Sequence, residues 1–227
     1  MVEAPVTGVS PGGGRMRDGQ ALDGRPLGKR GARTRRRLLD ATARLLEDRG
    51  VRELRVVDIA REVETSPATF YQYFRDVAEA VLALSEEVGE DLAPVGELLA
   101  RDWSGPSGLG ASRELVLAFI AYWDEHRAVL RTRNLAAQEG DQRFRTVRNT
   151  SLAPLLERFA SKVEASQRAG RVDEAIAPIA AASALMSMLE RMAAFHADLV
   201  PWGVEHDDLV ETTARILHQV VTGGRSR

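Results

Sequence analysis

The sequence predicts an all-α protein in which an N-terminal head of three helices precedes a larger C-terminal helical domain. Apolar residues recur at spacings of three and four along most of the chain, and no segment alternates convincingly as a strand. Between residues 56 and 74, two short helical patterns flank a polar turn, which is the arrangement of a helix-turn-helix. The net charge also changes sign at the end of this helix-turn-helix. Residues 1–75 hold 15 Lys and Arg against 10 Asp and Glu, whereas residues 76–227 hold 16 against 23.

Length and composition limit the number of domains and the classes of protein to which the chain can belong. The 227 residues suffice for one large or two small domains. Residues 1–28 are rich in Gly and Pro and poor in large apolar side chains, so we expect a disordered tail before a head at 29–75 and a second domain at 76–227. The absence of cysteine excludes disulfides and thiolate metal sites. No apolar stretch reaches the roughly 20 residues that cross a bilayer, so we expect a cytoplasmic protein without a membrane partner.

The head begins with a predicted helix over residues 32–48, whose inner face holds two apolar stripes. The second helix starts at Val56, with apolar residues at i, i+3, i+4 and i+7. Ser66 is suited to be the N-cap of the third helix, and Pro67 to be its first residue. This helix, over 68–73, is too short to be stable alone and must pack through Phe70 and Phe74. The two stripes of the first helix are Leu38, Ala41 and Leu45, and Leu39, Thr42 and Leu46.

The outer face of the third helix is polar. It presents Thr69, Gln72 and Tyr73, with Tyr71 near the edge. Hydrogen-bonding side chains of this kind are suited to a nucleic acid, although an ordinary amphipathic helical pair gives the same pattern. Between residues 25 and 37 the chain also holds seven basic residues and no acid. This run is either a solvated basic tail or, directly before a helix-turn-helix, an arm for the phosphate backbone or the minor groove.

The run DIAREVETSPATFYQYF, at residues 58–74 after an Arg-rich helix, resembles the DNA-binding domain of TetR-type repressors over about residues 33–85. The resemblance implies contacts with a double-stranded DNA operator, in which Thr69 and Gln72 reach base edges while Tyr71 and Tyr73 bind phosphates. The full set of expected DNA-binding residues is Arg33, Arg36, Arg55, Thr65, Ser66, Pro67, Ala68, Thr69, Tyr71, Gln72, Tyr73 and Arg75.

The chain departs from the family pattern at three positions. Glu64 lies where the family usually has a turn glycine, so the turn is expected to be strained or less sharp. Arg55 lies where a threonine commonly caps the second helix. Val77 replaces a lysine that often touches a phosphate, and Arg75 is expected to take over that contact.

The C-terminal domain is predicted to be helical throughout. A capping box, Asp76 to Glu79, opens the fourth helix, which Pro94 and Gly96 disturb near its end before a loop at 103–110. Helices near the C-terminus are apolar on several faces, which indicates burial against a second subunit. The resemblance likewise implies a homodimer formed by the last two helices. The later predicted helices span residues 112–126, 128–138, 141–169 with a kink at Pro154, 173–199 and 207–222.

Aromatic and methionine residues gather in this domain, and for each residue core packing is the plain alternative. As a group they fit an apolar cavity with a few polar groups such as Asn134, Glu190 or Arg191. The resemblance implies such a cavity, and a small hydrophobic or amphipathic effector is expected. The proposed ligand-binding residues are Phe119, Tyr122, Trp123, Asn149, Phe159, Met186, Met188, Leu189, Met192 and Phe195.

The sequence contains no motif that supports a catalytic or cofactor site. The glycines match no phosphate loop, and Gly105, Gly108 and Gly110 follow no strand. The four histidines are scattered, without metal-ligand spacing. We therefore expect no enzyme, cofactor or metal, but a ligand-responsive regulator, of repressor type, that binds a palindromic operator as a dimer. The alternatives are a helical small-molecule-binding protein or enzyme with only nonspecific DNA contacts and, less favoured, an interaction scaffold.

Overall fold

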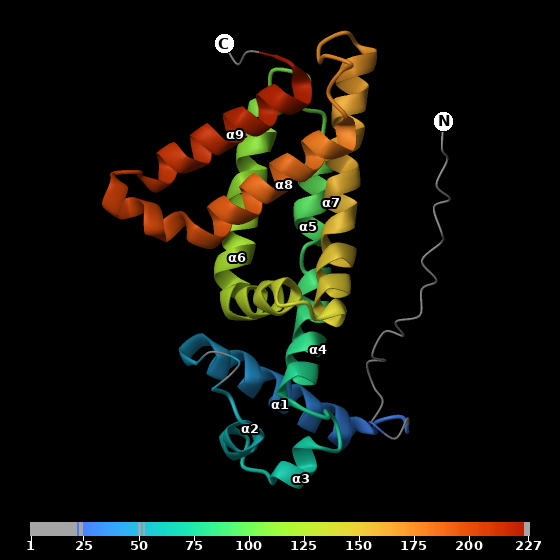
Figure 1. The fold of residues 1–227 in the computed structure, drawn as a ribbon, viewed down its shortest axis with the longest axis vertical. Coiled ribbons are helices and arrows are strands. Elements are labelled where there is room, and N and C mark those ends of the chain that lie inside the picture. Colours follow the sequence, from blue (N-terminus) through green and yellow to red (C-terminus); the bar gives the residue numbers. More distant parts are fainter. Residues whose placement is uncertain (1–21, 23–24, 50, 52, 225–227) are drawn as a thin grey trace.

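A computed structural model describes residues 22, 25–49, 51 and 53–224 of the chain. Within these residues the fold consists of nine α-helices and one 3-10 helix, without a strand, which confirms the all-α prediction. Figure 1 shows the small head at one end of an elongated molecule, with the longer helices of the C-terminal domain, the body, extending away from it. Most of the predicted tail at 1–28 lies outside the described residues.

The head contains α1 (Lys29–Asp48), α2 (Val56–Glu62) and α3 (Pro67–Phe70). Its core is the predicted one. The two stripes of α1 pack inward except for Leu45, which is half-buried, and α2 buries its apolar side against them. Phe70 and Phe74 are fully buried, with ring centroids 5.5 Å apart, so the recognition segment is held by its aromatic side chains.

The third helix is shorter than predicted. It covers one turn, and residues 71–73 continue as a turn rather than as α-helix. The amides of Gln72 and Tyr73 donate to carbonyls three residues earlier, at 3.2 and 2.9 Å, so the helix tightens into 3-10-like bonds at its end. The Phe74 amide still reaches the Phe70 carbonyl at 3.0 Å, which keeps both rings on the same inner face.

The predicted capping of α4 (Val77–Glu90) is confirmed, because the Asp76 carboxylate accepts a hydrogen bond from the Glu79 amide at 2.7 Å. The predicted disturbance near Pro94 and Gly96 is confirmed in part, because α4 ends at Glu90, just before them, but these two residues are not the end of that helix. They belong to a separate helix, α5 (Ala93–Ala100), because proline fits a first turn, where its missing N–H is not needed. The loop that follows covers residues 101–107, and α6 (Gly108–Gln138) starts four residues before the predicted Ser112.

The long helices follow the predicted divisions except over residues 173–199. His126 has non-helical angles inside α6, where the sequence predicted a break, and α7 (Gln142–Arg168) contains Pro154. The predicted helix over 173–199 was too long at both ends. Residues 173–177 form turns around Asp173, and α8 (Pro178–Phe195) is followed by the 3-10 helix η1 (His196–Trp202), in which proline prevents regular continuation. The last helix is α9 (His206–Thr222).

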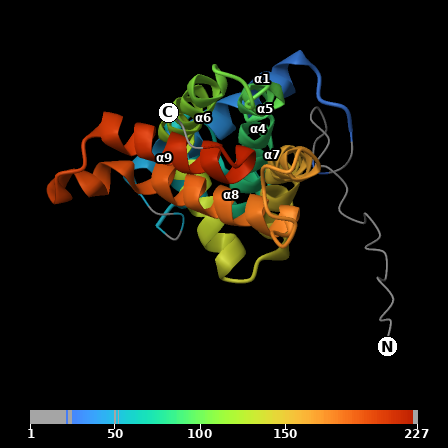
Figure 2. The ribbon, with the colours of Figure 1, turned by 90° about the horizontal axis from the view of Figure 1, so that it is seen from above.

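Helix α4 runs from the head into the helical bundle of the body. Helix α4 contacts α1 of the head and α6 and α7 of the body. α9 packs on α6 and α8 packs on α7, so α8, η1 and α9 form an outer layer that projects to one side of the molecule (Figures 1 and 2). In the part of the chain that is described, no helix is long and apolar enough to cross a membrane, and no cluster of His, Cys, Asp and Glu is suited to a metal ion.

Candidate DNA-binding interface and effector cleft

The turn between α2 and α3 is a Schellman motif closed by a glutamate. The Thr65 amide donates to the Ala60 carbonyl at 2.9 Å, and the Glu64 amide donates to the Arg61 carbonyl at 3.0 Å. Glu64 has φ of 56°, in the left-handed region that favours glycine. The turn keeps its geometry without the glycine, and the expectation of strain at this position is confirmed.

Replacing Glu64 with glycine is therefore expected to raise the free energy of unfolding by up to about 1 kcal/mol, because relief of the left-handed strain exceeds the added freedom of the unfolded chain. Urea denaturation measures this change. Glu64→Gln is the matched control, since it removes the charge but keeps the Cβ atom, and it should leave stability within about 0.5 kcal/mol. An equal gain in both variants would assign the effect to charge instead of strain.

The start of α3 is capped as predicted. The Ser66 hydroxyl accepts a hydrogen bond from the Thr69 amide at 3.2 Å, and Pro67 occupies the first turn. The Ser66 and Thr69 hydroxyl oxygens also lie 3.1 Å apart. Thr69 is half-buried and its hydroxyl is engaged with the cap, whereas Gln72 is exposed. Of the two residues expected at base edges, Gln72 has the more accessible side chain.

A groove of about 610 Å³ separates the beginning of α1 from α3. One wall is basic and comes from α1, and the other is polar and comes from the turn and the recognition segment. The groove brings together five of the predicted DNA-binding residues: Arg33, Thr65, Thr69, Gln72 and Tyr73. It also includes six residues absent from the predicted set: Arg30, Thr34, Arg37, Gly31, Val63 and Glu64. The first three recur at i, i+4 and i+7, and this helical spacing was the sequence signal for a shared face.

Arg37 holds the two walls together. Its Nη2 donates to the Val63 carbonyl at 2.8 Å, at the end of α2. This bond occupies a carbonyl that has no partner within the helix, as basic side chains often do at helix ends. Tyr73 is half-buried, and its hydroxyl lies beside Gly31 at the start of α1. The position of the recognition segment relative to α1 therefore rests on side-chain contacts across the groove.

The other predicted contacts surround this groove. Ser66, Pro67 and Ala68 are exposed at the start of α3, and Tyr71 is 52% exposed, with its ring edge-on to Phe70. Arg55 is exposed and is the N-cap of α2, and its side chain makes no capping hydrogen bond. Arg55 thus does not replace the threonine cap that the family commonly has at this position.

Arg36 lies apart from the groove. Its guanidinium pairs with Asp40 and with Glu87 of α4, both at 2.6 Å, so it joins the head to the body. The neighbouring Arg35 lies 3.9 Å from the Glu87 carboxylate, and its guanidinium also lies over the Phe74 ring. The partner of Arg36 on α4 is 51 residues away in sequence, which no local pattern reveals.

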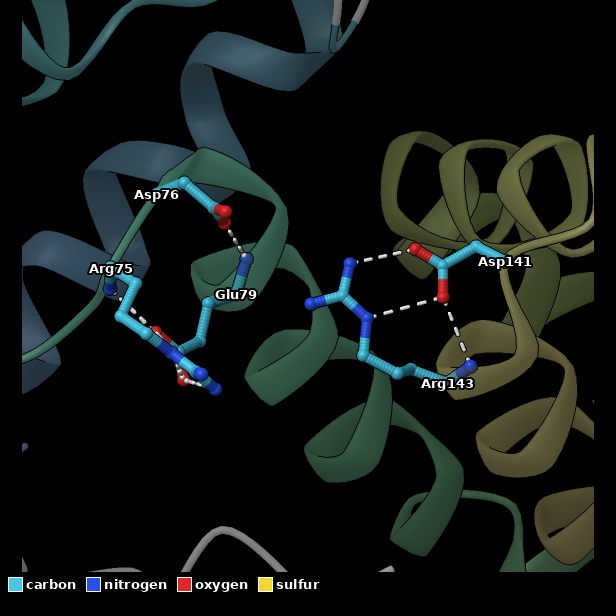
Figure 3. Close-up of polar contacts among 5 residues, drawn as sticks. All are labelled: Arg75, Asp76, Glu79, Asp141 and Arg143. Carbon is cyan, nitrogen blue, oxygen red and sulfur yellow. Dashed lines mark hydrogen bonds and ion pairs between the residues drawn. The ribbon is translucent and has the colours of Figure 1, made fainter.

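Arg75 forms an ion pair at the junction of head and body (Figure 3). Its guanidinium bonds to Glu79 at 2.9 Å, and its amide donates to the same carboxylate at 2.5 Å. Glu79 is only 2% exposed. Burial raises the pKa of this carboxyl, but the bonds from Arg75 lower it more, so the net pKa lies below its usual value. Across from it, at the start of α7, Arg143 pairs with Asp141 at 2.7 Å.

A cleft of about 1970 Å³ lies between the head and the body. Its walls come from α1, α4, α6, α7 and α8, and three of the predicted ligand-binding residues line it: Trp123, Asn149 and Phe195. The lining is more charged than the predicted apolar cavity. It includes Arg35, Glu87, Arg127, Arg148, Glu190 and Arg191. Asn134, Glu190 and Arg191 were named from the sequence as polar groups of the cavity, and all three line the cleft. Arg35, Glu87, Arg127 and Arg148 were missed because they come from four other stretches of the chain that only the fold brings together.

The remaining predicted ligand-binding residues do not line this cleft. Phe119, Tyr122, Phe159, Met186 and Leu189 are buried in the core, while Met188 and Met192 are half-buried. Phe159, for example, packs edge-on against Trp103, with centroids 6.1 Å apart. Core packing, the plain alternative for these side chains, describes them in this conformation. Contact with a ligand stays a prediction for them.

A buried polar cluster adjoins the cleft. Arg133 is 1% exposed, and its Nε donates to Asn134 at 3.1 Å. Glu190 is nearly buried and pairs with Arg148. The Tyr122 hydroxyl donates to the Val88 carbonyl of α4 at 3.1 Å, and burial raises the pKa of this phenol to about 12. Sequence reasoning named Tyr122 and Glu190 but missed Arg133, because an arginine in a polar stretch gives no signal of burial.

Comparison with solved structures supports the fold. The chain is similar to the fatty acid degradation regulator FadR of Bacillus halodurans, with 16% identity and a TM-score of 0.60, over 85% of this chain and 97% of that chain. FadR of Bacillus subtilis, solved with stearoyl-CoA, gives 15% identity and 0.61, over 83% and 98%. Thermus thermophilus FadR, solved with lauroyl-CoA, gives 20% and 0.55, over 82% and 94%. No curated protein matches the chain.

Family models match both parts of the sequence. Residues 38–84 match the model described as "Bacterial regulatory proteins, tetR family", which covers most of the head and the start of α4. Residues 95–227 match the model "Tetracyclin repressor-like, C-terminal domain", which covers more than half of the chain. Together with the helix-turn-helix geometry, these matches bear out the resemblance seen in the sequence. The chain belongs to the TetR family of bacterial transcriptional regulators.

Proposed function

We propose that this protein is a dimeric repressor that binds a palindromic operator and is released by an amphipathic effector. The observation that carries the proposal is the groove between α1 and α3, where a basic wall faces exposed polar side chains. Basic side chains such as Arg33 provide attraction to phosphates, which fixes the register of a protein on DNA. Exposed hydrogen-bonding groups such as Gln72 read base edges in the major groove.

The outer layer of the body supports the dimer. Apolar side chains remain exposed on α8, η1 and α9, among them Ile179 at 54%, Trp202 at 81% and Ile216 at 39%. Apolar surface of this kind marks an interface when it is contiguous, and α8 and α9 are the last two helices, where the sequence already indicated burial. A two-fold dimer presents two recognition segments to two half-sites, which one short helix alone does not supply.

The cleft supports the effector. At about 1970 Å³ it exceeds the roughly 300–1,000 Å³ of ordinary small-molecule pockets, which suits a long ligand. The two FadR structures solved with stearoyl-CoA and lauroyl-CoA suggest an effector of the acyl thioester type, with an apolar chain and a polar end. Because α4 lines the cleft and also contacts α1, a ligand that favours one position of α4 changes operator affinity reciprocally.

Selection of bound fragments from random DNA tests the proposal. The expected result is enrichment of one inverted repeat, with binding that weakens as salt is raised. A helical small-molecule-binding protein with nonspecific DNA contacts would show the same salt dependence but no preferred sequence. Retention without an enriched repeat would therefore reject the repressor and support that alternative.

Replacing Gln72 with alanine is expected to relax base preference at one position of each half-site, where a good contact discriminates by roughly 1–3 kcal/mol. The measurement is operator affinity against a set of single-base variants. Tyr73→Phe is the comparison, because loss of a phosphate contact should weaken operator and nonspecific DNA about equally. Unchanged selectivity in Gln72→Ala would remove this residue from base recognition.

A further inference from the structure

A backbone carbonyl without a helical partner lies near each end of the recognition segment, residues 65–73. The Val63 carbonyl comes just before the segment. In a helix it would accept from the amide four residues later, but that residue is Pro67, which has no N–H. The Gln72 carbonyl lies near the other end, where α3 has already given way to a turn. Both carbonyls therefore need a donor from outside the segment.

Both donors come from the N-terminal part of the chain. Nη2 of Arg37, on α1, donates to the Val63 carbonyl at 2.8 Å. The amide of Leu22, ahead of α1, donates to the Gln72 carbonyl at 3.2 Å. Two residues that are distant in sequence from the recognition segment thus hold it at both ends, and they hold its backbone and not its side chains.

Arg37 differs in this respect from the other arginines of the groove, Arg30 and Arg33. In the described part of the chain, the guanidinium groups of Arg30 and Arg33 form no hydrogen bond or ion pair, so they are available to phosphates. The Arg37 guanidinium is engaged with a protein carbonyl, and a bond of this length from a charged donor is a strong one. Three arginines on one helical face therefore have two different environments.

The position of the recognition segment depends on what holds its ends, because α3 is a single turn without stability of its own. The buried rings of Phe70 and Phe74 attach the segment to the core, and both lie on its inner face. Two anchors on one face leave the segment free to tilt about the line that joins them. Bonds to the carbonyls at its two ends remove this freedom and fix where Gln72 lies relative to α1.

We propose that Arg37 and the Leu22 amide are positioning groups for base recognition, which set the place of the recognition segment relative to α1 and contact no DNA themselves. This inference rests on the proposed function. Operator binding needs the phosphate contacts of Arg33 and the base contacts of Gln72 in one register, whereas nonspecific binding needs the phosphate contacts alone. Loss of either bond therefore lowers operator affinity and leaves nonspecific affinity nearly unchanged.

The test compares Arg37→Met with Arg33→Met, because both variants of the full-length protein remove one charge from the same wall of the groove. Affinity is measured at several salt concentrations for two duplexes of equal length: the inverted repeat that the unaltered protein enriches, and a shuffled sequence. We expect Arg37→Met to weaken binding of the repeat at least about tenfold and of the shuffled duplex less than about twofold, with an unchanged salt slope. Arg33→Met should weaken both duplexes about equally and flatten the log–log salt slope by about 0.9 for each bound subunit.

Leu22→Pro tests the other end of the segment, since proline lacks the N–H that bonds to the Gln72 carbonyl. Leu22→Ala is the matched control, because it shortens the side chain and keeps the amide. We expect Leu22→Pro to lower the ratio of repeat to shuffled affinity about threefold or more, and Leu22→Ala to leave the ratio unchanged. Leu22 is 42% exposed and precedes α1, so this pair of variants decides even if Arg37→Met does not fold.

Two outcomes would overturn the proposal while the proposed function stands. A flatter salt slope in Arg37→Met, with equal weakening of both duplexes, would make Arg37 a phosphate contact. An unchanged affinity ratio in folded Arg37→Met or in Leu22→Pro would leave these groups a structural role only, whatever urea denaturation shows of their stability. An unaltered protein that enriches no repeat would instead reject the repressor function, and this inference with it.

Discussion

Replacing Phe70 with alanine is expected to abolish operator binding by unfolding the recognition segment. Phe70 is fully buried, and its ring packs against Phe74 and Tyr71 at centroid distances of 5.5 and 5.9 Å. Removal of a buried phenylalanine side chain costs roughly 3–5 kcal/mol. Because α3 is a single turn with no stability of its own, this loss falls on the segment that presents Gln72. Urea denaturation and operator binding are the measurements.

Tyr71→Ala is the matched control for this prediction. Tyr71 is adjacent in sequence and 52% exposed, so its removal should change the free energy of unfolding by less than about 1 kcal/mol. Its effect on DNA should be a loss of affinity without unfolding. Operator binding by Phe70→Ala at full affinity would contradict the view that this ring holds the recognition segment in place.

The second large effect is expected at Glu79, where replacement by alanine should destabilise the protein by about 2–3 kcal/mol, the value of hydrogen bonds to a buried charge. Glu79 accepts from the amide and the guanidinium of Arg75, and its own amide is held by Asp76 (Figure 3). Arg75 is exposed, so its charge returns to water and adds no further penalty. The denaturation midpoint at neutral pH measures the loss.

The same carboxyl makes stability depend on acid. Burial raises the pKa of Glu79 and the bonds from Arg75 lower it further than burial raises it, so the folded pKa lies below the ordinary value of 4.5. A lowered folded pKa gives stability that is present above 4.5 and is lost as pH falls through the folded value. Glu79→Gln should therefore show a smaller loss of stability on acidification than the unaltered chain. Glu97→Gln, at an exposed position, should not.

Local patterns in the sequence determined most of the secondary structure. The apolar spacing of α1 and α2, the caps at Ser66 and Asp76 and the break in α6 near His126 all depend on residues within one or two turns of each other. Glu64 was found through the family resemblance, because it lies where that pattern has a turn glycine, and its backbone is left-handed in the structure. The family resemblance could be recognised from the sequence because its motif is one continuous run of residues.

Packing between distant segments decided which side chains meet between helices. Arg36 pairs with Glu87, and only the docking of α1 on α4 brings these residues together; its contact with DNA stays a prediction. The cleft takes its charged lining from five helices, and the burial of Arg133 depends on how α6 is enclosed. Periodicity tells which side of a helix is apolar, but not which neighbour covers it or which polar groups meet there. The recognition segment was therefore determined by sequence, whereas the charged lining of the cleft was decided by tertiary structure, because it comes from helices that are distant in the chain.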